Sequence, residues 1–211
     1  MKVVLASNNA KKLAELATLF DGLGIELVRQ GDLGVDETDE PHGTFLENAL
    51  AKARHASRVT GLPAIADDSG LCVDALGGAP GVISAHYAEL PPDGAAREVH
   101  RARQDAANNA LLLQRLAAHP ADDERRANFF CLLLALRHAH DPQPLLATGR
   151  WQGRILAQAD GDGGFGYDPL MFIPALGRTV ARLDAAVKNA HSHRALAAAQ
   201  MRSQLRDAWL P

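Results

Sequence analysis

An alternation of apolar runs with one amphipathic segment at the N-terminus constrains the fold class more than any other feature. Residues 2–6 form a short apolar run with β-branched side chains, which predicts a buried strand. Residues 7–12 are polar and predict a loop. The next segment predicts a helix, because apolar side chains recur in it at helical spacing: Leu13, Leu16, Phe20 and Leu23. The helix should end near Gly22 or Gly24, and residues 25–28 predict a second strand. This order of elements is the beginning of an α/β layer.

The rest of the chain continues this pattern. Thr44 and Glu47 form a capping-box pair that opens a second helix, which the run Gly61-Leu62-Pro63 should end. Apolar patterning predicts further elements: helices over 106–118 and from 183 to the end, strands over 127–137 and 151–155, and an extended segment over 82–87. Residues 161–167 include four glycines and should be irregular. Since no repeat or linker-like segment interrupts it, the chain is predicted to be a single α/β domain over residues 1–211, in one or two lobes.

Composition and charge narrow the class of protein. With 47% hydrophobic residues in 211, the chain can form a core without a metal or disulfide staple. A net charge of -3 argues against a nucleic-acid binder, which would normally carry a basic surface. Cys72 and Cys131 lie in apolar runs, which predicts core thiols in a reducing compartment. No apolar run approaches the ~20 residues that span a membrane, and the N-terminus does not resemble a signal peptide. We therefore predict a cytoplasmic protein without a membrane partner.

Two adjacent carboxylates, Asp67 and Asp68, stand between apolar runs that predict buried strands. A buried charge is costly unless it is paired or holds a metal, so this position has two interpretations. One is an Asx-type turn between two strands. The other is a magnesium site at a strand end, because Mg²⁺ usually takes one or two carboxylates together with substrate phosphates. Glu40, in the acidic segment 31–42, is the candidate for the second carboxylate.

The segment from Ser7 to Lys12 combines a hydroxyl, amides and lysines between a strand and a helix. Backbone N–H groups and the dipole at a helix N-terminus favour an anion, so the segment is a candidate phosphate site. Helix capping explains Ser7 and Asn9 equally well.

Two later segments also combine residue types that suit a nucleotide. Phe165 and Tyr167 are bracketed by glycines, which favours stacking on a base, while Asp168 could accept a hydrogen bond from a base or ribose. A glycine turn with an aromatic plug is the alternative. Near the C-terminus, Ser192 can cap the last helix, which places His193 and Arg194 at its positive end. Such a conflict is typical of a functional site, although an exposed helix is the simpler explanation.

The order of these motifs along the chain closely resembles that of the inosine/xanthosine triphosphate pyrophosphatases, over residues 2–205. The matching motifs are Ser-x-Asn-x-x-Lys, Thr-Phe-x-Glu-Asn-Ala, Ala-Asp-Asp-Ser-Gly-Leu, Gly-Gly-Ala-Pro-Gly, Gly-Gly-Phe-Gly-Tyr-Asp-Pro and Lys-x-x-x-Ser-His-Arg. The resemblance implies Mg²⁺-dependent hydrolysis of non-standard purine nucleoside triphosphates (ITP, dITP, XTP) to the monophosphate and pyrophosphate, cleansing the nucleotide pool. It also implies a homodimer and an α/β fold with a long central mixed sheet flanked by helices, in two lobes around an active-site cleft.

The resemblance also implies roles for individual residues. Glu40 and Asp68 match the metal carboxylates, and Asp68 also matches the proposed proton acceptor. The residues that match the phosphate-binding segment are Ser7, Asn8, Asn9, Ala10, Lys11 and Lys12. Lys52 matches a triphosphate-contacting lysine, and Ser69 matches a substrate contact. The base and sugar pocket is matched by Phe165, Gly166, Tyr167 and Asp168. The residues around the purine and its 6-oxo group are matched by Lys188, His193 and Arg194.

This chain departs from the family pattern at three positions. Asn8 replaces a glycine, which leaves the turn feasible because Asn tolerates left-handed dihedrals. His86 replaces an arginine, and His191 replaces an apolar residue. Two other functions fit the same motifs: a pyrophosphatase for modified pyrimidine nucleotides on a similar scaffold, and a nucleotide-binding module without activity. Carboxylates facing phosphates favour the enzyme over the binding module.

Overall fold

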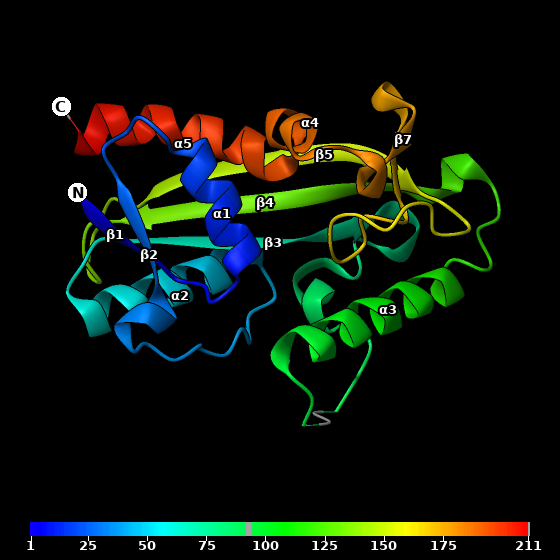
Figure 1. Ribbon diagram of the computed structural model, residues 1–211, viewed down its shortest axis with the longest axis horizontal. Helices are drawn as coiled ribbons and strands as arrows, with labels where there is room; N and C mark the ends of the chain where they lie inside the picture. The colour runs from blue at the N-terminus through cyan, green and yellow to red at the C-terminus, as the bar shows by residue number, and fades with distance from the viewer. Residues whose placement is uncertain (92–93, 211) are drawn as a thin grey trace. The chain divides into compact units, whose positions relative to one another are not determined.

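The computed structural model describes residues 1–91 and 94–210 and shows an α/β fold built on one seven-stranded sheet (Figure 1). The strands follow the order β2-β1-β3-β4-β5-β6-β7 across the sheet. Their bounds are β1 Lys2–Leu5, β2 Glu26–Arg29, β3 Ala64–Val73, β4 Arg126–Leu136, β5 Leu145–Ile155, β6 Met171–Ile173 and β7 Arg178–Thr179. β1 pairs in parallel with β2 and β3, whereas β6 is antiparallel to β5 and β7. The predicted mixed sheet is confirmed.

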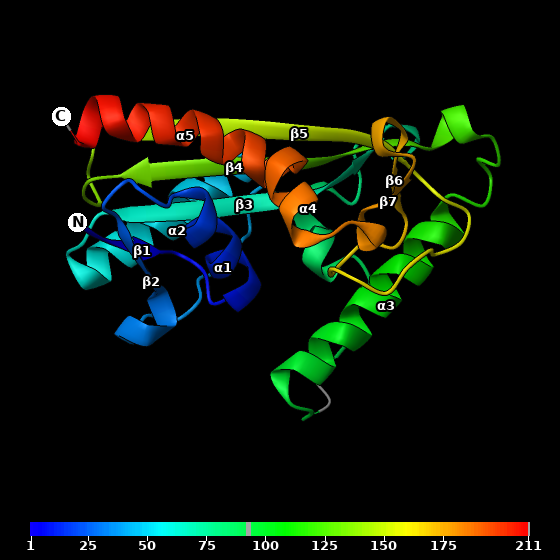
Figure 2. The same ribbon diagram turned by 45° about the horizontal axis from the view of Figure 1, so that its top comes forward.

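Five α-helices accompany the sheet in the described residues (Figure 2): α1 Ala10–Leu19, α2 Phe45–Thr60, α3 Arg97–Arg115, α4 Ala185–His191 and α5 His193–Trp209. The signals read at the ends of α2 are confirmed. The Thr44 hydroxyl accepts a hydrogen bond from the Glu47 amide at the N-terminus, and Gly61 adopts the left-handed conformation that ends the helix. No helix in residues 1–91 and 94–210 combines the length and the apolar character needed to cross a membrane.

The chain divides into two compact units. Unit 1 comprises Met1–Ser69, Cys131–Gly149 and Asn189–Pro211, and unit 2 comprises Gly70–Phe130 and Arg150–Lys188. β3, β4 and β5 each pass from one unit into the other along the chain. The prediction of a single domain with a cleft between two lobes stays a prediction.

Each unit has its own hydrophobic core. In unit 1 the core joins side chains of α1 and α5 to those of the central strands, including Leu16, Met201, Ile65 and Leu133. In unit 2 it joins α3 to the other strand segments, including Leu112, Leu116, Leu71 and Ile155. The two cysteines are free thiols, with Cys131 buried in the unit 1 core, as predicted.

Three predictions about local structure were wrong. The extended segment over 82–87 is instead the 3₁₀-helix η3, Gly81–His86. The helix predicted from residue 183 to the end is two helices, interrupted at Ser192, although the predicted Ser192 cap is confirmed: its hydroxyl accepts from the Ala195 amide at 3.1 Å at the start of α5. Most important for the site, Asp67 and Asp68 lie neither at a strand end nor in a turn, because β3 runs through them without interruption. The two apolar runs, predicted to be separate strands, form one ten-residue strand.

Candidate functional site

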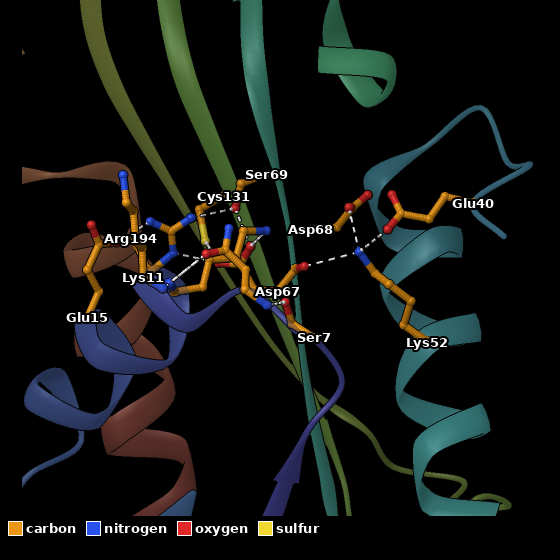
Figure 3. A network of polar contacts seen from close by, with 12 residues as sticks. Ser7, Lys11, Glu15, Glu40, Lys52, Asp67, Asp68, Ser69, Cys131 and Arg194 are labelled. Atoms are coloured by element: carbon orange, nitrogen blue, oxygen red, sulfur yellow. Dashed lines mark hydrogen bonds and ion pairs between the residues drawn. The ribbon is translucent and has the colours of Figure 1, made fainter. Parts of the chain in front are cut away.

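The continuity of β3 directs Asp67 and Asp68 to opposite sides of the sheet, because successive side chains of a strand alternate. Figure 3 shows the α1 and α5 ribbons on one side of β3 and the α2 ribbon on the other. Asp67 points towards Arg194, whereas Asp68 points towards Lys52 and Glu40. The two carboxylates therefore belong to separate clusters of unit 1, each with its own basic partner.

Asp67 is fully buried and ion-paired on its side of β3. Its Oδ2 accepts from Arg194 Nε at 2.7 Å, and its Oδ1 accepts from Lys12 Nζ and from the Ser69 hydroxyl, the latter at 2.7 Å. Burial alone would raise the pKa of Asp67, but the charges of Arg194 and Lys12 outweigh it and hold that pKa well below its ordinary value. Asp67 is therefore an anion at neutral pH, ion-paired with Arg194 and Lys12.

Arg194 is only 1% exposed and carries the other half of this cluster (Figure 3). Its Nη1 donates to Glu15 Oε2 at 2.5 Å, and its Nη2 donates to the Ser69 hydroxyl at 3.4 Å. Asp67 and Glu15 raise its pKa against the opposing effect of burial. A buried ion pair of this kind is tolerated only when hydrogen bonds satisfy both partners, as they do here. The exposed-helix interpretation is thus wrong for Arg194.

The second cluster centres on the Lys52 ammonium. Lys52 Nζ donates to Asp68 Oδ1 at 2.8 Å, to Glu40 Oε1 at 3.0 Å and to the Asp67 backbone carbonyl at 3.1 Å. These three acceptors match the three donors of an ammonium group. Burial would lower the pKa of Lys52, but the charges of Asp68 and Glu40 outweigh it and raise that pKa. The ammonium therefore stands as a cation between the two predicted metal carboxylates.

Asp68 retains one oxygen that the described part of the protein does not satisfy. Its Oδ2 is buried and accepts no hydrogen bond from residues 1–91 or 94–210. Burial raises the pKa of Asp68 to about 6, against the opposing effect of Lys52. A carboxylate oxygen without a hydrogen-bond partner is the kind of ligand that Mg²⁺ prefers. A second carboxylate, that of Glu40, is close by, because it is ion-paired with the same Lys52 ammonium. The residues present therefore fit a magnesium ion.

The candidate magnesium site has two carboxylates, those of Glu40 and Asp68. Within the described ranges, no three His, Cys, Asp or Glu side chains are grouped so that they could hold a metal by themselves. Two carboxylates suit Mg²⁺, which keeps open coordination positions for water and for substrate phosphates. They suit zinc poorly, since zinc sites normally use three or four protein ligands.

The segment from Ser7 to Lys12 contains the start of α1. Asn9 is the N-cap, and its side-chain oxygen accepts from the amides of Lys11 and Lys12 at 3.0 and 3.3 Å. The Ser7 hydroxyl accepts from the Asn9 amide at 3.2 Å. The capping interpretation is confirmed for Asn9, whereas Ser7 closes a turn onto the N-cap residue and does not cap the helix. The phosphate site stays a prediction.

Asn8, at the position where the resemblance leads one to expect glycine, has a contact of its own. Its Oδ1 accepts from the Gly31 amide at 2.8 Å. It therefore ties the segment before α1 to η1, Gln30–Leu33, which glycine would not do.

In unit 2, residues 164–168 form an irregular loop, as predicted, and it is tied together by Asp168. Asp168 Oδ2 accepts from the Phe165 amide at 3.0 Å and from Lys188 Nζ at 2.9 Å. Lys188 Nζ also lies 4.4 Å from the centroid of the Phe165 ring, within range of a cation–π interaction. A Cβ at Gly164 would collide with the Asp168 carboxylate, and its φ of +77° also requires glycine.

Tyr167 behaves differently from Phe165. Its ring is buried in the unit 2 core, and its hydroxyl donates to the Ser84 carbonyl at 2.9 Å. Burial raises its pKa above the ordinary tyrosine value. Tyr167 therefore matches the aromatic-plug interpretation, whereas Phe165 is only partly buried.

The predicted site residues divide between the units. Unit 1 brings together Lys12, Glu40, Lys52, Asp67, Asp68, Ser69 and Arg194, and also holds the buried His193. Unit 2 brings together Phe165, Asp168 and Lys188, with Gly166 and Tyr167 in the same loop. The two substituted histidines, His86 and His191, are exposed.

Sequence reasoning missed Glu15 and Cys131, which complete the Asp67 cluster. Cys131 Sγ lies 3.5 Å from Asp67 Oδ2, and burial raises its thiol pKa. Glu15 lies 179 residues before Arg194 in the chain. No local pattern could have joined residues so distant, because periodicity reports only on neighbours within one element.

Comparison with known proteins gives consistent matches along the whole chain. The model of the Ham1 family matches residues 3–204. A dITP/XTP pyrophosphatase of Methylibium petroleiphilum is 65% identical and covers 100% of both chains. A dITP/XTP pyrophosphatase of Leptothrix cholodnii is 64% identical over 99% of both. The structure is similar to that of a HAM1 protein from Coxiella burnetii, with a TM-score of 0.85 and 42% identity over 99% of this chain and 100% of that one.

Proposed function

This chain belongs to the Ham1 family, and on that premise we propose that it hydrolyses non-standard purine nucleoside triphosphates to the nucleoside monophosphate and pyrophosphate. The proposed substrates are XTP, dITP and ITP, and the proposed role is to cleanse the nucleotide pool. The named activity of two relatives at 64% and 65% identity supports this. The observation that carries the chemistry is the buried, unsatisfied Oδ2 of Asp68 beside Lys52 and Glu40.

In this proposal Asp68 and Glu40 would hold Mg²⁺ together with phosphate oxygens of the substrate. When bound, Mg²⁺ would neutralise the charge that develops on those oxygens. With a pKa of about 6, Asp68 is mostly ionised at neutral pH. Its carboxylate can then orient the attacking water and accept its proton.

The lysines supply the remaining positive charge in this mechanism. Lys52 and Lys12 each donate to a carboxylate within unit 1, so a triphosphate would share or replace those acceptors. Phosphoryl transfer needs little covalent help from the protein, and most of its catalysis is positioning and electrostatics. The substrate contacts of Ser7, Asn8, Asn9, Ala10, Lys11 and Ser69 belong to the same proposal.

Recognition of the base is assigned to the unit 2 loop and to donors near α5. Phe165 offers a ring face and Asp168 an acceptor, while Gly166 and Tyr167 complete the loop. Lys188, His193 and Arg194 are the proposed donors to the 6-oxo group, although three nitrogens of Arg194 already donate to Asp67, Glu15 and Ser69. A site built to hydrogen-bond one edge of a base rejects a base that lacks the partner, because its own donors go unpaired.

The test is pyrophosphate release from XTP, dITP, ITP, ATP, GTP and a modified pyrimidine triphosphate, with Mg²⁺ and with a chelator. We expect rapid release from the first three, little from the others and none without metal. Preference for the pyrimidine would point to the alternative pyrophosphatase. Binding of XTP without turnover would leave only a nucleotide-binding module.

A Glu40→Gln variant should be slowed about tenfold, and less than a variant of Asp68. The reason is burial: the Glu40 side chain is 42% exposed, whereas that of Asp68 is 5% exposed, so water can replace part of what Glu40 provides. Turnover of XTP against Mg²⁺ concentration should show a higher half-saturating concentration. An Asp36→Asn variant, which removes an exposed carboxylate of the acidic segment, is the control and should behave like the wild type.

We also propose that the protein acts as a homodimer in the cytoplasm, where the nucleotide pool lies. The support for the dimer is the family resemblance. Sedimentation at micromolar concentration should then give about twice the 22.5 kDa mass of one chain. A mass near 22.5 kDa would reject it.

A further inference from the structure

Two side chains of helix α3 hydrogen-bond to the backbone of one residue, Gly166, in the proposed base-binding loop. Asp105 Oδ2 accepts a hydrogen bond from the Gly166 amide at 2.9 Å, and Asn109 Nδ2 donates to the Gly166 carbonyl at 2.9 Å. Asp105 and Asn109 are four residues apart, so they lie on the same face of α3. All three residues belong to unit 2.

Within residues 165–168, Gly166 is the residue whose backbone has the most conformational freedom in the unfolded chain. Gly166 has a φ of +61°, a conformation that glycine adopts readily but with a large loss of backbone freedom. It is also the link between Phe165 and the Tyr167–Asp168 pair. Because the α3 side chains hold its amide and its carbonyl, they fix the direction in which the chain enters and leaves this position.

α3 is itself anchored to the same part of unit 2 as the loop. Asn108 Nδ2 donates to the carbonyls of Ser84 and Ala85 at 3.2 and 3.1 Å, and the Tyr167 hydroxyl donates to the same Ser84 carbonyl. Gln104 donates to Asn108 Oδ1 at 2.9 Å. The helix and the loop therefore both hydrogen-bond to η3, which connects them a second time besides the two bonds to Gly166.

We infer that Asp105 and Asn109 are positioning residues for base recognition. They act through Gly166 to hold Phe165 and Asp168, the ring face and the acceptor, in the geometry that binds a purine. The inference rests on the proposed function, since it takes the 165–168 loop as the base pocket. Neither residue belongs to the motifs that suggested the site, and an acidic and an amide side chain in a polar helix give no sequence signal.

The test compares Asp105→Ala with Asp105→Asn. Alanine removes the acceptor for the Gly166 amide, whereas asparagine retains an oxygen that can accept the same bond. Asn109→Ala removes the donor to the Gly166 carbonyl. Binding of XMP, measured by calorimetry, should weaken roughly tenfold in each alanine variant and by less than about threefold in Asp105→Asn. Asp123→Ala, which removes an exposed carboxylate elsewhere in unit 2, is the control for net charge and should bind XMP like the wild type.

Inorganic tripolyphosphate separates positioning of the base from general damage, because it carries the phosphates without a base. Its affinity should change by less than about twofold in all of these variants, and their melting temperatures should stay near the wild-type value. Equal losses for XMP and tripolyphosphate, or wild-type XMP binding in Asp105→Ala and Asn109→Ala, would overturn the inference.

The XMP measurement also keeps this inference distinct from the proposed activity, because it needs no turnover. A wild-type protein that binds XMP but releases no pyrophosphate from XTP would contradict the proposed hydrolysis alone. Failure of the wild-type protein to bind XMP would contradict the positioning role.

Discussion

An Asp68→Asn variant should lose at least about a hundredfold in turnover of XTP and keep its fold. Asparagine has nearly the same shape but neither charge nor basicity, so it can provide neither a strong magnesium ligand nor a proton acceptor at Oδ2. Removing one such interaction from a transition state typically costs about 3 kcal/mol, which corresponds to a hundredfold or more. The measurement is kcat at saturating XTP and Mg²⁺, alongside circular dichroism to verify the fold.

The stability of this variant should stay close to that of the wild type, because two effects oppose each other. The folded-state pKa of Asp68 is raised from 3.8 to about 6, so its contribution to stability is present below pH 3.8 and is lost as pH rises through 6. At pH 8 asparagine avoids the free-energy cost of burying the ionised Asp68 carboxylate. It also leaves the Lys52 ammonium with Glu40 as its remaining carboxylate partner among the described residues. Asp36→Asn, an exposed carboxylate of the acidic segment, is the matched control. Near-wild-type turnover of Asp68→Asn at saturating Mg²⁺ would show that Asp68 has neither role.

Asp67→Asn should have the largest effect on stability and lower the free energy of unfolding by about 3 kcal/mol at pH 7. The substitution leaves the buried guanidinium of Arg194 without its closest anion and also removes the partner of Lys12. An uncompensated buried charge is costly because little solvent reaches it. Urea unfolding at pH 7 measures the change.

The pH dependence of this difference follows from the direction of the pKa shift. The folded-state pKa of Asp67 lies well below 3.8, so its contribution is present above the unfolded-state pKa and is lost as pH falls through the folded-state value. The gap between wild type and Asp67→Asn should therefore stay level from pH 7 to about pH 5 and narrow only below 3.8.

Asp32→Asn is the control, because it breaks an exposed ion pair with Arg29 by the same substitution. It should cost less than about 1 kcal/mol. Equal losses of unfolding free energy in Asp32→Asn and Asp67→Asn would mean that the buried ion pairs of Asp67 stabilise the protein no more than an exposed pair does.

Local patterns predicted most of the elements correctly, and their failures have a common cause. The α2 boundaries followed from Thr44, Glu47 and Gly61, whose capping roles depend only on residues a few positions away. β3 was misread because two polar residues inside an apolar run are typical of a turn. In the folded protein Lys12 and Arg194 pair with Asp67, and Lys52 pairs with one oxygen of Asp68, so the strand can continue through both carboxylates.

The sequence by itself determined the α/β class, the order of the main elements and the motifs that indicate a nucleotide triphosphate site. It also singled out Asp67 and Asp68 as a pair. Only the tertiary structure decided that the pair is split between two faces of β3, that Asp67 is a buried counter-ion of Arg194, and that Asp68 retains an unsatisfied oxygen. The physical reason is that these roles depend on partners 16 to 127 residues away, whose approach is set by packing rather than by local propensity. The hydrogen bonds of Asp105 and Asn109 to the Gly166 backbone also depend on packing, since they join residues 61 and 57 positions apart.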